Sequence, residues 1–131
     1  MQTAGRGTLD ITHLVAEVVE GYSCTSGLAN VFLQHTSASL ILCENADPQV
    51  RRDLEAWLSR AIPDADPLFL HTQEGPDDMP AHVRSVLTAT SLNIPIVQGR
   101  LALGTWQGLY LYEHRTAPHC RQVWITLLDS A

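Results

Sequence analysis

The chain has 131 residues, a net charge of −6 and a sequence pI near 5.3, and these values limit its possible functions. This length suits a single domain over residues 1–131 with one core, and it is too short for a separate cofactor-binding domain. The acidic balance argues against a nucleic-acid partner or an anionic membrane surface, because both normally need clustered Lys and Arg. All eight basic side chains are arginines, which suit contacts with the phosphate or carboxylate of a small ligand.

Neither a membrane span nor a secretory signal is evident in the sequence. No apolar run approaches the roughly 18 residues needed to cross a bilayer, and the residues after Met1 lack the apolar core of a signal peptide. We therefore expect a cytoplasmic protein. The cysteines Cys24, Cys43 and Cys120 are odd in number and contain no Cys-x-x-Cys pair, so we expect them mainly to fill packing positions.

The first third of the chain predicts a helix followed by two strands. Asp10 can cap a helix over residues 11–22, where apolar residues recur at spacings of three and four. Residues 28–35 alternate as a strand does, and their apolar row ends at His35. A second strand is predicted over residues 36–43. Its hydroxyl-rich start beside His35 favours a polar pocket.

A second helix is predicted from Pro48 to Ala61. Asp47 is a good N-cap, and proline is favoured at the first helical position. We expect the charged side chains of this helix to face solvent. Its predicted buried stripe consists of Val50, Leu54, Trp57, Leu58 and Ala61.

The segment from His71 to His82 holds the densest group of ligating side chains. It carries two imidazoles and the carboxylates of Glu74, Asp77 and Asp78, in a chain of which only 17% is charged. A connecting loop needs Gly, Pro and Asp for its turns, but it has no need of histidines and a glutamate. Because these residue types bind metals and move protons, the segment is a candidate site.

A third helix is predicted to begin within this segment. Asp77 or Asp78 can cap it, and Pro80 is tolerated in the first turn, where amide protons lack helical partners. On such a helix Asp78 and His82 are four residues apart and share one face. We expect Val83 and Leu87 to contact the core.

From Ser91 onward the pattern changes to strands. Alternating apolar residues on both sides of Gly99 predict a hairpin over residues 92–103. A strand is predicted over residues 105–115, and residues 121–128, apolar on both faces, favour a central covered strand. Helices and strands do not alternate regularly along the chain. The pattern therefore predicts an α+β domain with antiparallel strands joined by hairpins.

Four histidines from four predicted elements are candidate metal ligands. They are His35, His71, His82 and His114. Neutral imidazoles near carboxylates suit zinc or another transition metal, although the spacing matches no compact motif such as His-Glu-x-x-His. Structural interpretations stay open, with Asp77 and Asp78 as helix caps and Glu113 with Arg115 as an ion pair.

Nucleophilic catalysis has less support in the sequence. Ser37 and Ser39 share a strand face with His35, but no Gly-x-Ser-x-Gly elbow exposes either hydroxyl. A Walker loop and a dinucleotide fingerprint are also absent from the sequence.

Four stretches of the chain stand out as motifs, and they lie within residues 34–40, 44–55, 74–82 and 103–115. Together they resemble the signature segments of the YjbQ family, also called the secondary thiamine-phosphate synthase family. The resemblance implies an antiparallel β-sandwich with helices packed against it, assembled as a homotrimer with the motif residues near subunit boundaries. It also implies a weak activity that joins hydroxymethylpyrimidine diphosphate to a thiazole phosphate, giving thiamine phosphate and pyrophosphate. A non-catalytic homotrimer that binds a metal or metabolite is the alternative.

The resemblance further implies residue roles around small phosphorylated metabolites. A divalent metal, magnesium or zinc, would neutralise the diphosphate leaving group. The expected metal ligands are His71, His82 and His114, the expected catalytic residues are Glu74, Asp77, Asp78 and His35, and the expected substrate-binding residues are Asn45, Ser37, Trp106, Gln107, Glu113 and Arg115.

The chain departs from the family pattern in two places. Members commonly read Leu-Thr-x-Asn-Glu-Asn where this chain has residues 40–45, so Ile41 and Cys43 replace a polar pair. If those positions touch ligand, the family activity is affected, whereas Cys43 could instead add a soft metal ligand or a reactive thiol. The beginning of the chain is also short, so we expect the usual first strand to be missing or reduced.

Overall fold

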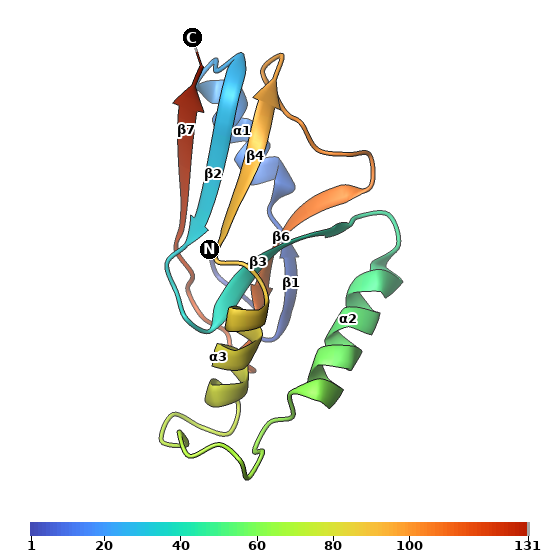
Figure 1. Ribbon diagram of the computed structural model, residues 1–131, viewed down its shortest axis with the longest axis vertical. Coiled ribbons are helices and arrows are strands. Elements are labelled where there is room, and N and C mark those ends of the chain that lie inside the picture. Colours follow the sequence, from blue (N-terminus) through green and yellow to red (C-terminus); the bar gives the residue numbers. More distant parts are fainter. Residues whose placement is uncertain (131) are drawn as a thin grey trace.

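Two antiparallel sheets form the framework of the molecule, and three helices accompany them (Figure 1). The computed structural model describes residues 1–130. One sheet has the strand order β5-β4-β2-β7 and the other has the order β1-β6-β3. The strands are β1 Gly7–Asp10, β2 Ser26–Leu33, β3 Ala38–Glu44, β4 Ser91–Val97, β5 Arg100–Leu101, β6 Gln107–Glu113 and β7 Val123–Asp129, and the helices are α1 Thr12–Gly21, α2 Pro48–Ala61 and α3 Asp78–Leu87. The predicted α+β class with antiparallel sheets is confirmed.

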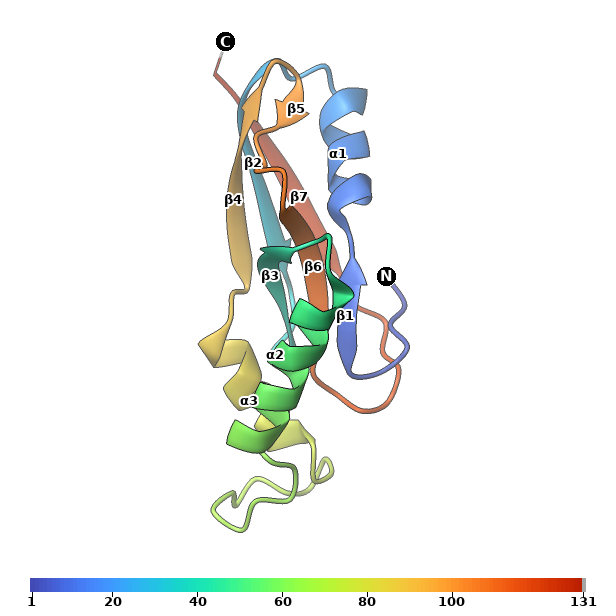
Figure 2. The same ribbon diagram turned by 90° about the vertical axis from the view of Figure 1, so that its right-hand side faces the viewer.

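The main core joins the two sheets to α1, which runs beside the four-stranded sheet (Figure 2). Ile11, the N-cap residue of α1, and Val15 within α1 are completely buried, because their spacing of four places both on the inward face. The strands supply the other buried residues, which are Val31, Leu33, Ala38, Leu40, Ile94, Leu109 and Leu111. Each fully buried Val, Leu or Ile contributes about 1.5–3 kcal/mol relative to an exposed one.

The last strand lies at the edge of its sheet, contrary to the central position predicted for residues 121–128. β7 pairs only with β2, and the outer face of these two strands stays open to solvent. Phe32 and Trp124 are cross-strand neighbours there and are 41% and 54% exposed. The apolar residues on both faces of β7 therefore reflect an uncovered apolar surface.

Helix α2 begins and ends where the sequence predicts, from Pro48 to Ala61, with the Asp47 carboxylate accepting a hydrogen bond from Gln49 N at 2.9 Å. The predicted buried stripe is wrong. Within the helix only Leu58 is buried, whereas Trp57 is 56% exposed. Figure 1 shows α2 standing out beside the body of the molecule, and Leu58 is the residue of the helix that joins a buried cluster, with Ile62 and Tyr112.

Helix α3 and strand β1 also differ from expectation. α3 begins at Asp78, and Val83 packs against the small cluster around Leu58, but Leu87 is 65% exposed and contacts no core. The first strand is present, since β1 pairs with β6 in a regular antiparallel register. Asp10 ends that strand, and its carboxylate accepts from Thr12 N at 2.9 Å as α1 begins.

Three further expectations concern the hairpin after α3, the cysteines and membrane spans. Residues 92–103 form the predicted hairpin of β4 and β5, in which Gly99 adopts φ +75° at the turn. Cys24 is buried as expected of a packing residue, whereas Cys43 is half-buried and Cys120 is exposed. No helix among residues 1–130 combines the length and the apolar character that crossing a bilayer requires.

Candidate metal centre

Three side chains at the beginning of α3 place their ligand atoms within 4.8 Å of one another. Asp78 Oδ2 lies 2.7 Å from His71 Nε2 and 3.2 Å from His82 Nε2. Asp78 and His82 share a helix face because they are four residues apart, and the loop before α3 brings His71 to the same point. The carboxylate is almost fully buried, whereas the side chains of His71 and His82 are 47% and 32% exposed. The group is thus a buried anion beneath two imidazoles that solvent can reach.

The orientation of His82 leaves one ring nitrogen for a cation. Its Nδ1 lies 3.1 Å from the carbonyl oxygen of Thr36. A carbonyl only accepts, so Nδ1 donates to it and Nε2 is the nitrogen that faces the Asp78 carboxylate. Two lone pairs cannot face each other favourably, so a proton or a metal ion must lie between them. A backbone carbonyl on the second nitrogen is the usual way in which proteins orient a metal-ligating histidine.

The spacing of the group suits a single ion. Bonds of about 2.0–2.2 Å from a metal to nitrogen and oxygen place its ligand atoms about 3–4 Å apart. The side chains of His71, Asp78 and His82 are already near this separation, so small side-chain movements would complete the coordination.

Arg115 holds the acidic side of the group in place. Its Nη1 donates to Asp78 Oδ1 at 2.8 Å, its Nε donates to Asp77 Oδ2 at 3.0 Å, and its Nη2 donates to the carbonyl of Glu74 at 2.8 Å. Burial acts to raise the pKa of Asp78, but the hydrogen bond from His71 and the charges of His82 and Arg115 outweigh it and lower that pKa. Asp78 is therefore an anion that is ready to bind a cation.

Asp77 has a structural position beside the group of His71, Asp78 and His82. Its carboxylate does not cap α3, as one sequence interpretation expected, but accepts from Arg115 and from the backbone N–H and hydroxyl of Thr116 at 2.8 and 3.1 Å. Burial acts to raise the pKa of Asp77, yet these hydrogen bonds and the Arg115 charge outweigh it and hold the pKa at about 2. Asp77 thereby fastens the loop before α3 to the chain after β6.

Replacing Asp77 with asparagine is expected to remove a stabilising contribution of about 2 kcal/mol. The folded pKa of about 2 lies below the ordinary 3.8, so this contribution is fully present above pH 3.8 and is lost as the pH falls through about 2. Urea unfolding of the wild type and Asp77→Asn at pH 7 and pH 3 measures it. The difference between the two proteins should shrink at pH 3, and a constant difference would assign the effect to something other than the charge.

His114 and Glu113 lie in the interior and are not among the three clustered ligating side chains. His114 is completely buried with its Nε2 2.8 Å from Ser39 Oγ, and burial lowers its pKa to about 3, helped by the charge of Arg84. The Glu113 carboxylate is also buried and accepts from Arg121, from Thr3 and from two backbone N–H groups. Solvent reaches neither side chain, and His114 Nδ1 is a buried atom without a hydrogen-bond partner. The metal role of His114 and the substrate-binding role of Glu113 stay predictions.

Ser37 belongs to the same interior network. It is buried, and its hydroxyl accepts from Arg121 Nη2 at 2.9 Å. The hydroxyl of Ser37, for which a substrate-binding role was expected, is therefore already hydrogen-bonded in the core.

The other predicted site residues are distributed elsewhere. Asn45, Trp106 and Gln107 lie at the far end of the β3–β6 pair, where Glu44 faces Gln107. Six residues of strand separate that end from Glu113, which corresponds to about 20 Å. His35 follows β2 and accepts from Gln122 N at 2.8 Å. One chain therefore brings together His71, Asp77, Asp78, His82, Arg115 and the Glu74 backbone. Asn45, Trp106 and Gln107 lie at a distance, and the side chains of Ser37, Glu113 and His114 have other partners.

One member of the site has no signal in the sequence. The carbonyl of Thr36 orients His82, but any residue at that position would supply a carbonyl. Only the packing of α3 against β3, through Ser85 Oγ donating to the Ala38 carbonyl at 3.2 Å, places the two segments together.

Comparisons with known proteins give a consistent result. A family model described as UPF0047 protein YjbQ-like matches residues 1–130. A UPF0047 protein of Synechocystis is 50% identical over 121 residues, covering 92% of this chain and 82% of that protein. The UPF0047 protein YjbQ of Escherichia coli O157:H7 is 48% identical over 101 residues, covering 77% and 72%. A crystal structure of a conserved hypothetical protein from Thermus thermophilus has a TM-score of 0.84 at 34% identity, covering 98% of this chain and 99% of that one.

Proposed function

The chain belongs to the UPF0047 YjbQ-like family, and we propose that it binds one divalent metal ion through His71, Asp78 and His82. The observation that carries this proposal is a buried carboxylate oxygen that faces the Nε2 atoms of two imidazoles. Two nitrogen donors favour zinc or a similar transition metal over magnesium, which prefers oxygen ligands. Solvent access on the imidazole side leaves room for a further ligand.

We further propose that this centre serves a weak thiamine-phosphate synthase activity. The reaction forms a C–N bond between a thiazole phosphate and hydroxymethylpyrimidine diphosphate and breaks a C–O bond, so that pyrophosphate leaves. Such a step needs stabilisation of the leaving anion more than a protein nucleophile, which agrees with the lack of a nucleophile elbow in the sequence. A bound divalent metal would supply charge neutralisation, while Arg115 keeps Asp78 in place.

A second candidate is a protein that binds a metal or metabolite without turnover. It is favoured by the interior positions of Ser37, Glu113 and His114, since these side chains leave few polar groups around the metal group to orient a substrate. Ile41 does not decide between the candidates, because it packs against the cluster of Leu58, Ile62 and Tyr112.

We also propose that the protein acts as a cytoplasmic homotrimer with its site near a subunit boundary. The open apolar face of β2 and β7, with Phe32, Trp124 and Leu128, offers a surface whose burial would favour association. A neighbouring copy is also the simplest source of the Asn45 and Trp106 segment that one chain holds far from His82. Light scattering should then give three times the 14.4 kDa chain mass, and a monomer mass would contradict this assembly.

Metal binding and activity are tested separately. Protein stripped of metal and reloaded with zinc is expected to retain one zinc per chain by elemental analysis, and no retained metal would contradict the site. With zinc or magnesium added, the wild type is expected to form thiamine phosphate from the two precursors, and Asp78→Ala is expected to lose that activity. Equal rates in the two proteins would separate the activity from this site, and zinc retention without product would favour the binding protein.

A further inference from the structure

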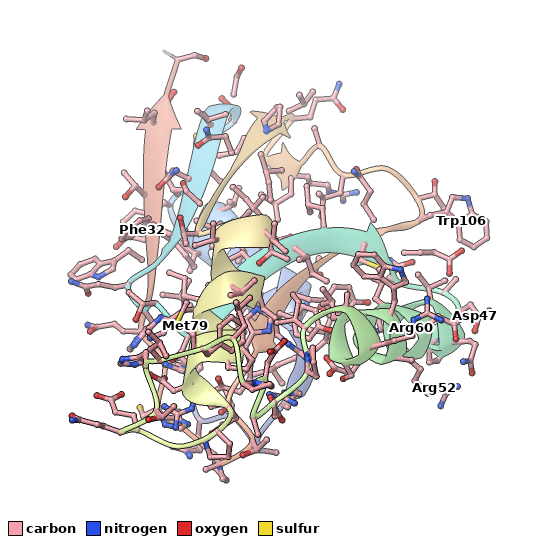
Figure 3. All side chains as sticks on the ribbon, turned by 60° about the horizontal axis from the view of Figure 1, so that its bottom comes forward. Phe32, Asp47, Arg52, Arg60, Met79 and Trp106 are labelled. Atoms are coloured by element: carbon pink, nitrogen blue, oxygen red, sulfur yellow. The ribbon has the colours of Figure 1, made fainter. Side chains whose placement is uncertain are left out.

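A hollow between β1 and α2 is lined by two arginines and measures about 290 Å³. Arg51 and Arg52 come from the first half of α2, and Gly7 and Thr8 come from β1. The lining shares no residue with the metal group of His71, Asp78 and His82. Figure 3 shows the separation, with Arg52 on the α2 side of the molecule and Met79 of α3 on the other.

Both guanidinium groups keep donors free. Arg51 Nη1 donates to the carbonyl of Glu44 at 2.8 Å, and its guanidinium carbon lies 4.6 Å from the centroid of the Tyr110 ring. Arg52 Nε donates to the side-chain amide oxygen of Gln49 at 3.1 Å. Among residues 1–130, no carboxylate forms an ion pair with either arginine. Arg51 is thus held by neutral partners and forms no ion pair.

The carboxylate that borders the hollow, Glu55, is already neutralised from the other side. It accepts from Nη1 of the completely buried Arg84 at 2.9 and 3.1 Å, and also from the hydroxyls of Ser59 and Tyr112. Because Arg84 neutralises Glu55, the guanidinium groups of Arg51 and Arg52 make the lining of the hollow positively charged. This local excess occurs in a chain whose net charge is −6.

The walls of the hollow add further groups that suit an anion. Pro48 is the first residue of the 14-residue helix α2, so the positive end of the helix dipole borders the space. β1 is an edge strand whose other side lacks a partner, and the Thr8 hydroxyl forms no hydrogen bond within the described part of the chain. A hydroxyl and edge amides beside two guanidinium groups match the acceptors of a tetrahedral anion.

We propose that this hollow binds the phosphate group of a small metabolite, with Arg51 and Arg52 as the donors. Guanidinium groups pair with phosphate through two parallel hydrogen bonds, which an ammonium group cannot provide. The volume lies near the lower limit of small-molecule pockets, which suits a phosphate monoester of one small ring better than a polymer. Binding here needs neither the metal ion nor the synthase reaction.

The test uses inorganic phosphate and metal-free protein, so that phosphate on a bound metal does not contribute. Titration calorimetry of the full chain is expected to show saturable binding, with the Gly7 and Thr8 amides shifting in a parallel NMR titration. Arg52→Gln is expected to weaken binding about tenfold or more, because a charge-assisted pair is lost. This exposed residue has only the contact with Gln49, so the variant should fold as the wild type does.

Two matched controls separate a built site from general charge attraction. Arg60→Gln removes the same charge from an exposed position on the same helix, outside the hollow, and is expected to leave binding unchanged. The double variant His71→Ala, His82→Ala should also bind phosphate as the wild type does. No saturable binding by the wild type, or equal weakening by Arg60→Gln and Arg52→Gln, would overturn the proposal.

Discussion

Replacing Glu113 with alanine is expected to lower the free energy of unfolding by about 3–5 kcal/mol, because it leaves a buried guanidinium without its counter-charge. The side chains of Glu113 and Arg121 are only 1% and 5% exposed. Burial acts to raise the pKa of Glu113, but hydrogen bonds from Arg121 and Thr3 outweigh it and lower that pKa. The carboxylate therefore stays ionised inside the protein and joins the beginning of the chain to β6 and the segment before β7.

Urea unfolding followed by circular dichroism at one protein concentration measures this loss. Glu17→Ala is the matched control, since Glu17 pairs with His13 on the surface at 3.1 Å and should change stability by less than about 0.5 kcal/mol. The double variant Glu113→Ala, Arg121→Met should recover part of the loss, because it removes the stranded charge as well. A loss below about 1 kcal/mol in Glu113→Ala would mean that water reaches Arg121 and compensates it.

The double variant His71→Ala, His82→Ala is expected to lose zinc binding by at least about 100-fold in Kd, because a lone carboxylate held by an arginine is a poor zinc site. The remaining Asp78 oxygen would still accept from Arg115. Since both imidazoles are partly exposed, the variant should stay folded. Zinc titration with a competing chelator gives the two dissociation constants.

His13→Ala serves as the control for general imidazole binding. The side chain of His13 is 88% exposed on α1, where it pairs with Glu17. It should leave zinc affinity unchanged, whereas the double variant should not. Unchanged affinity in the double variant would place the zinc elsewhere, for example on the exposed Cys120, and would remove the basis for the proposed metal centre.

Helix α2 shows which features of the fold were predictable, because its bounds were predicted correctly and its burial was not. Its bounds follow from local chemistry, since Asp47 caps the first turn and Pro48 suits the first helical position. Its burial does not follow from local chemistry, because an apolar stripe identifies an apolar helix face but not how much of that face other elements will contact. The body of the molecule meets that face at Leu58, and Trp57 stays exposed. β7 was misplaced for the same reason, as its two apolar faces do not reveal how many of them are covered.

The candidate site also has features that the sequence predicted and features that it did not. The spacing of Asp78 and His82 was readable from the sequence, because helix geometry makes residues four apart neighbours. The surroundings of His114 could not be predicted, since alternation along β6 shows which residues share a face of the strand but not which residues pack over that face. Burial between Ser39 and Tyr112, rather than proximity to His71, is a property of the packed structure.

Most of the helices and strands, the antiparallel α+β class and the acidic, histidine-bearing segment from His71 to His82 were predictable from the sequence, because turns, caps and periodicity are local. Strand β1 was the exception. Which ligating groups converge depends on tertiary packing. Arg115 comes from beyond β6 and the Thr36 carbonyl from before β3, yet both fix the geometry at the beginning of α3. Contacts between residues that are dozens of positions apart depend on how the sheets and helices pack, and packing leaves no signature in the spacing of residues along the chain.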